Sequence, residues 1–65
     1  MGLVIVGIDP GSQITGVGAI RAQSGRAIHL EHGVLAAPAR LGFEARLAHM
    51  HEGLRQALSR LNPDV

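Results

Sequence analysis

The chain opens with a run of apolar residues in which polar and apolar positions do not alternate. Leu3 to Ile8 is apolar at both odd and even positions, which is typical of a central strand buried on both sides. The next four residues, Asp9-Pro10-Gly11-Ser12, predict a turn. Pro presets φ for the first central position, and Gly accepts the positive φ that a type II turn needs at the second.

Two further strands are expected after this turn. Thr15 to Arg21 reads as a strand that returns antiparallel to the first, with Gly16 and Gly18 on one face. Because glycine weakens a strand, this pair indicates close approach by a helix, a ligand or another backbone. The segment 23–26 predicts the next turn, and Ala27 to Leu35 the third strand.

Strict alternation in the third strand predicts how its side chains divide between the two faces. Ile28, Leu30 and Val34 would share one face. His29, Glu31 and Gly33 would share the other, which also separates His29 from His32.

A helix is expected from about Leu41 to Leu61, after a connection at 36–39 that contains Pro38. Apolar residues recur there at steps of three and four and form one stripe: Phe43, Leu47, Met50, Leu54, Ala57, Leu58 and Leu61. Phe43 is therefore predicted to be a core residue. Asn62-Pro63 ends the helix, and Asp64-Val65 is expected to begin a further strand.

Composition predicts a single domain over residues 1–65 and excludes several classes of protein. The net charge is +1, with six Arg and no Lys, so a nucleic-acid partner is permitted but not required. Cys is absent, which excludes disulfides and thiolate metal sites. No run of residues is apolar enough for a membrane span, and residues 1–6 do not resemble a signal peptide. We therefore expect no membrane partner and a cytoplasmic location.

Asp9 is the candidate functional residue, because it is a carboxylate at the end of a buried strand and directly before a turn that contains glycine. Nucleases of the ribonuclease H type use such an acid as a ligand of Mg²⁺, which prefers hard oxygen donors. Actin-like ATPases place one near the nucleotide phosphates. Alternatively, Asp9 only closes the turn by accepting hydrogen bonds from backbone amides. The apolar strand before Asp9 and the glycine-containing strand after it favour a chemical role.

The other polar residues are interpreted as structural. His49 and His51 lie about 200° apart around the helix, so they cannot bind one metal ion together. Ser12 and Thr15 lack a neighbouring base and are expected to stabilise the turn through their hydroxyl groups. Glu52 and Arg55 are spaced to form an ion pair on the helix surface.

The segments Gly7-Ile8-Asp9-Pro10-Gly11-Ser12 and Thr15-Gly16-Val17-Gly18 resemble the N-terminal signature of RuvC, the family of bacterial Holliday-junction resolvases. The resemblance implies an α/β ribonuclease H-like fold, here its first three antiparallel strands and first helix, with the fourth strand cut off at Val65. It also implies a homodimer that cuts four-way DNA junctions by Mg²⁺-dependent hydrolysis and works with branch-migration machinery.

The resemblance further implies four acidic ligands for two Mg²⁺ ions, of which Asp9 matches the first. The second, a Glu, would follow Val65 by a few residues, near position 69, and Glu44 and Glu52 cannot replace it because both lie on the helix. We expect this chain to be about the first third of an enzyme and to be inactive alone.

Three other functions stay open from the sequence. The first is a ribonuclease H-like nuclease that acts on RNA, of the YqgF type. The second is an actin-like ATPase with Asp9 at the phosphate site. The third is a small module that binds a partner through an exposed sheet edge.

Overall fold

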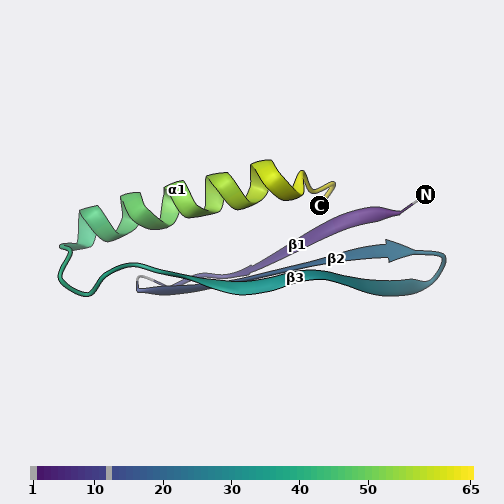
Figure 1. Cartoon of the computed structure of the whole chain (residues 1–65), viewed down its shortest axis with the longest axis horizontal. Helices are drawn as coiled ribbons and strands as arrows, with labels where there is room; N and C mark the ends of the chain where they lie inside the picture. The colour runs from purple at the N-terminus through teal and green to yellow at the C-terminus, as the bar shows by residue number, and fades with distance from the viewer. Residues whose placement is uncertain (1, 12) are drawn as a thin grey trace.

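The computed structural model describes residues 2–11 and 13–65, and within them it shows one antiparallel sheet and one helix (Figure 1). The elements follow in the order β1 (Leu3–Asp9), β2 (Ile14–Gln23), β3 (Arg26–Ala36) and α1 (Phe43–Leu61), and the strands lie in the order β1-β2-β3. The predicted succession of three strands and a helix is confirmed. The helix begins two residues later than predicted, because Gly42 is still extended.

The two turns of the sheet differ in their use of glycine. Ser24 and Gly25 have φ of 51° and 74°, which is a two-residue turn of the kind that suits the twist of a hairpin. Gly11 does not have the positive φ that the sequence predicted. Close approach requires glycine there instead, because a Cβ on Gly11 would lie 2.3 Å from the carbonyl oxygen of Ile14.

A bulge in β3 overturns the predicted division of its side chains. Ala19 of β2 pairs with Glu31, but the next residue, Ile20, pairs with His29, so Leu30 is an extra residue without an opposite neighbour. Alternation therefore reverses at this point, and His29 comes to share a face with His32.

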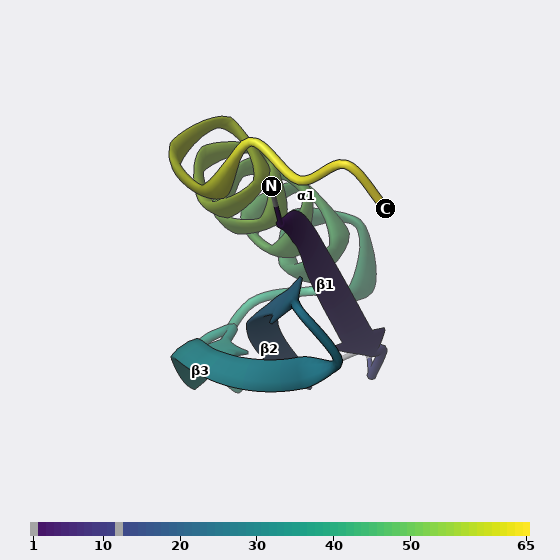
Figure 2. The same ribbon diagram turned by 90° about the vertical axis from the view of Figure 1, so that its right-hand side faces the viewer.

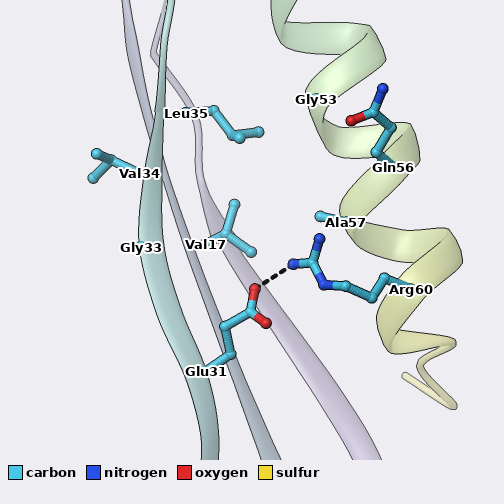
Figure 3. Close-up of a pocket in the computed structure, with 9 residues that line it drawn as sticks. All are labelled: Val17, Glu31, Gly33, Val34, Leu35, Gly53, Gln56, Ala57 and Arg60. Carbon is cyan, nitrogen blue, oxygen red and sulfur yellow. Dashed lines mark hydrogen bonds and ion pairs between the residues drawn. The ribbon is translucent and has the colours of Figure 1, made fainter.

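The two faces of β3 differ in what they meet. Glu31, Gly33 and Leu35 lie on the side of α1, whereas the side chain of Val34 points away from the helix (Figure 3). Leu35 packs closely on α1, where a Cβ at Gly53 would lie 3.2 Å from its methyl carbons. Gly53 thus lets the helix approach the sheet.

The core is small and lies between α1 and the β2–β3 hairpin. Its buried apolar residues are Ala19, Ala37, Met50 and Ala57. Phe43, predicted to be in the core, is 58% exposed, and the guanidinium of Arg46 lies 5.9 Å from the centre of its ring. The prediction was wrong because the apolar stripe of α1 is longer than the surface that covers it.

The chain covers only one face of β1, so the prediction that this strand is buried on both faces was also wrong. Leu3, on the face away from α1, is 51% exposed, and Ile8, which pairs with Val17 on the α1 side, is still 42% exposed. Figure 2 shows α1 on one side of the sheet and no described element on the other. The side chains of β1 are therefore apolar on both faces, although the described residues cover only one of them.

After α1 the chain returns to the free edge of β1. Asn62 adopts the left-handed conformation, with φ of 47°, and donates its amide to Leu58. Val65 then donates to the carbonyl of Val4 and accepts from the amide of Val6, at 3.2 and 2.9 Å. This is the pattern of a parallel pair centred on Ile5 and Val65, as expected for the beginning of a further strand. The described helix is not long and apolar enough to cross a membrane.

Candidate metal-binding site at the end of β1

Asp9 lies at the C-terminal end of β1 with its side chain in solvent. It is exposed, and its Cα partner on β2 is Gly16. A Cβ added to Gly16 would lie 3.6 Å from the Cβ of Asp9, so the glycine leaves space beside the carboxylate. Side chains of paired residues share a face, which places Asp9 on the face opposite α1, together with Val34.

Thr15 holds the turn between β1 and β2. Its hydroxyl donates to the carbonyl of Gly11 at 3.0 Å and accepts from the amide of Gly11 at 3.2 Å. Thr15 is 2% exposed, so it acts as a structural residue, as predicted. Ser12 lies outside the described residues. Within residues 2–11 and 13–65 the Asp9 carboxylate makes no hydrogen bond.

The surface beside Asp9 is a floor without side chains. Gly7 and Gly18 face each other across β1 and β2, and a Cβ at either one would meet no atom within 4 Å. A helix does not approach these glycines, because α1 lies on the other face. What they provide is an open strip of backbone next to an exposed acid.

The other acidic side chains are positioned elsewhere. Glu31 of β3 is paired with Arg60 of α1, Glu52 with Arg55, and Asp64 accepts from the amide of Val4 at 2.9 Å. Glu44 lies in the first turn of α1. In the described part of the chain, no three His, Cys, Asp or Glu side chains form a group that could hold a metal ion.

The ion pair of Glu52 and Arg55 confirms the predicted helix-surface contact. The guanidinium donates to both carboxylate oxygens at 2.9 and 2.6 Å, and Gln56 donates at 3.3 Å. These hydrogen bonds, those of Arg55 first, lower the pKa of Glu52 from 4.5 to about 2. Glu52 and Arg55 are therefore paired with each other within one turn of α1, and neither takes part in a site with Asp9.

A cavity of about 260 Å³ lies between β3 and α1, away from Asp9 (Figure 3). Gly33 and Leu35 line one wall and Gly53 and Ala57 the other, while the Glu31–Arg60 pair spans it. The cavity reflects small residues at the sheet–helix contact. Because it lies on the α1 face, it does not connect with the carboxylate.

Two histidines of β3 that were predicted to lie on opposite faces of the strand are in contact. His29 and His32 lie with ring nitrogens 2.8 Å apart, contrary to the prediction that they occupy opposite faces. The bulge at Leu30 is the cause, and alternation along the strand gives no signal of its position. His49 and His51 are exposed on α1, as predicted for surface residues.

A comparison with family models matches residues 5–65 to the crossover junction endodeoxyribonuclease RuvC. The chain belongs to the RuvC family. The match covers β1 from Ile5 onward, the turn after Asp9, the β2–β3 hairpin, α1 and the return to the edge of β1.

Curated relatives agree with this result. The chain is 36% identical over 64 residues to the crossover junction endodeoxyribonuclease RuvC of Bdellovibrio bacteriovorus, a match that covers 98% of this chain and 38% of the relative. It is 40% identical over 61 residues to that of Geotalea uraniireducens, covering 94% and 36%. For that of Thermotoga maritima the identity is 39% over 62 residues, covering 95% and 37%. The chain thus spans rather more than a third of the length of these relatives. No solved structure matches it.

Membership of the RuvC family supports the ribonuclease H-like fold expected from the sequence, and the described strands and helix are consistent with its N-terminal portion. The relatives are named as endodeoxyribonucleases. Neither the ATPase nor the RNA nuclease of the YqgF type receives support from these matches.

Proposed function

We propose that this chain supplies the first metal-binding carboxylate of a Mg²⁺-dependent endonuclease that resolves four-way DNA junctions. The observation that carries the proposal is the position of Asp9. It is an exposed carboxylate at the C-terminal end of β1. Membership of a family of junction endodeoxyribonucleases supplies the substrate class.

Asp9 fits Mg²⁺ as one ligand among several. Its carboxylate is a hard oxygen donor on a paired strand, which is the kind of ligand that Mg²⁺ takes alongside retained waters. When bound, the ion would supply Lewis acidity for hydrolysis of a phosphodiester. A single carboxylate is too weak to hold the two ions of such a site, so further acidic ligands are required.

The register at the edge of β1 supports a place for a second acid. Val65 is the parallel neighbour of Ile5. In a chain that continues in this register, residue 67 lies beside Gly7 and residue 69 beside Asp9, because paired strands advance together. An acidic side chain at position 69, which the family resemblance predicts to be Glu, would therefore share the face of Asp9.

The remaining residues of the site hold and expose this carboxylate. Thr15 fixes the turn through its two hydrogen bonds to Gly11. Gly16 and Gly18 leave the adjacent sheet surface free of side chains, which suits the close approach of a DNA strand. Homodimerisation and cooperation with branch-migration machinery belong to this proposal as properties implied by the family.

The test is cleavage of a synthetic four-way junction by the full-length protein, or by a chimera that joins residues 1–65 to the remainder of the Thermotoga maritima relative. We expect Asp9→Asn to abolish Mg²⁺-dependent cleavage while junction binding in Ca²⁺ is retained. Glu44→Gln is the matched control, because it removes an exposed carboxylate from α1 and should leave cleavage unchanged. Cleavage at the original rate by the Asp9→Asn protein would refute the assignment.

Two further measurements separate this function from its rivals. A ribonuclease H-like nuclease of the YqgF type would cleave single-stranded RNA in preference to the four-way junction. An actin-like ATPase would be protected from thermal unfolding by ATP and would show no affinity for the junction.

A further inference from the structure

The contact between His29 and His32 is the feature of the sheet that the proposed nuclease function does not use. Nε2 of His29 and Nδ1 of His32 are 2.8 Å apart, and the ring centres are separated by 5.0 Å with an angle of 58° between planes. Both side chains are exposed. Two imidazole rings therefore lie next to each other on the protein surface, joined by one hydrogen bond between their nitrogens.

This contact depends on the backbone. In a regular strand, residues three apart point to opposite faces. The extra residue at Leu30 shifts the pairing by one, so that His29 lies opposite Ile20 and His32 opposite Gly18. Because Gly18 has no side chain, the imidazole of His32 has an open floor beneath it.

The spacing of the two nitrogens is close to that of two ligands on one metal ion. With metal–nitrogen bonds of about 2.0–2.1 Å, a right-angled pair of ligands has its nitrogens roughly 2.9 Å apart. A tetrahedral pair needs roughly 3.3 Å. The observed 2.8 Å is the distance of an N–H···N hydrogen bond, and rotation of the two exposed rings brings both lone pairs onto the right-angled arrangement that Cu²⁺ and Ni²⁺ adopt in tetragonal sites with nitrogen ligands.

The surroundings leave an imidazole-only site. Glu31 lies between the two histidines in the sequence, but it faces α1 and is paired with Arg60. No carboxylate joins the two imidazoles in a three-member group within the described residues. Such a donor pair suits borderline transition-metal ions and not Mg²⁺, whose preferred ligands are oxygens.

We propose that Nε2 of His29 and Nδ1 of His32 chelate a divalent transition-metal ion of the Cu²⁺ or Ni²⁺ class, with water completing its coordination. Binding needs a lone pair on each of these nitrogens, so the imidazole that donates the hydrogen bond carries its proton on its other ring nitrogen when the ion is bound. The site lies on the same sheet face as Asp9, separated from it by Gly7 and Gly18. Its ligands are imidazole nitrogens instead of a carboxylate. It does not rest on the proposed nuclease function.

The test is titration of the 65-residue chain with Ni²⁺ by isothermal calorimetry at neutral pH. His29→Ala and His32→Ala should each weaken binding by roughly tenfold or more, at least the lower loss seen when a supporting residue of a metal site is removed. The double variant His49→Ala/His51→Ala is the matched control. It removes the other two exposed histidines and should change the affinity less than twofold. Equal Ni²⁺ affinity of the unsubstituted chain, the His29→Ala chain and the His32→Ala chain would overturn the proposal.

A second measurement avoids dependence on the folding of the variants. Substoichiometric Ni²⁺ is paramagnetic and broadens the NMR signals of the side chains that bind it. In the unsubstituted chain, the imidazole signals of His29 and His32 should broaden together, before those of His49 and His51. Broadening of all four histidines at the same Ni²⁺ concentration would also overturn the proposal.

Discussion

The amide nitrogen of Val6 lies 2.9 Å from the carbonyl oxygen of Val65, although almost the whole chain separates these two residues. This bond, the bonds that the amides of Asp64 and Val65 donate to the carbonyl of Val4, and the carboxylate of Asp64 that accepts from the amide of Val4 attach the end of the chain to β1. They set the parallel register from which the position of a second acid beside Asp9 follows. The attachment can be tested by breaking its side-chain contact.

Asp64→Ala should loosen the segment after α1. It removes the carboxylate that accepts from Val4 at 2.9 Å, a hydrogen bond worth about 1 kcal/mol. Hydrogen exchange at the amides of Val4 and Val6 should therefore accelerate roughly fivefold, as measured by NMR. Glu44→Ala, a loss of an acid elsewhere, should leave these two amides unchanged. Unaltered exchange in the Asp64→Ala protein would show that backbone pairing alone holds the segment.

Gly11→Ala should destabilise the β1–β2 turn, because the new Cβ would lie 2.3 Å from a backbone oxygen of Ile14. Backbone must move to relieve the clash, at a cost of about 1–3 kcal/mol. Gly7→Ala is the matched control, since a Cβ there meets nothing within 4 Å and alanine restricts the unfolded chain. Urea denaturation compares the two. Equal stability of both variants would contradict the role of Gly11 as a close-approach glycine.

Met50→Ala and Phe43→Ala should differ, although the sequence places both residues on one apolar stripe. Met50 is 5% exposed and Phe43 is 58% exposed. Loss of the buried side chain should lower the free energy of unfolding by about 2–3 kcal/mol, and loss of the exposed ring by well under half of that. Thermal denaturation followed by circular dichroism gives both values. A larger loss for Phe43→Ala would mean that its ring is buried in solution.

Glu52 should titrate near pH 2 and depend on Arg55 for this value. Its pKa is about 2 in the folded chain and 4.5 without its partners. The pair therefore contributes stability that is fully present above pH 4.5 and disappears as the pH falls towards 2. Arg55→Ala should move the carboxyl titration, followed by ¹³C NMR, back towards 4.5. Arg60→Ala provides the control, because Arg60 contacts Glu31 instead.

Much of the candidate site could be predicted from local sequence. The run of β-branched residues before Asp9 specifies a strand, and Pro10 requires that the chain turn directly after it. Thr15 could be assigned to turn stabilisation because a hydroxyl near a tight turn finds backbone partners. These features depend on neighbours within a few residues, and the structure reproduces them.

Predictions of burial and of faces failed where they depended on distant parts of the chain. The exposure of Phe43 and Ile8 depends on how much surface one helix can cover, which periodicity does not reveal. The contact of His29 with His32 depends on a one-residue bulge, after which every side chain changes face. Gly11 was correctly placed in a turn, but for the wrong backbone reason.

The amino-acid sequence alone specifies the order of strands and helix, the position of Asp9 at a strand end, and the family resemblance carried by the residues around it. Periodicity, proline and glycine act locally, so a linear reading can recover their effects. The folded chain was needed to establish that Val65 pairs beside Ile5, that Asp9 faces away from α1, and that two histidines are in contact. Each of these results depends on register between segments, which hydrogen bonds across the sheet set and which no single segment encodes.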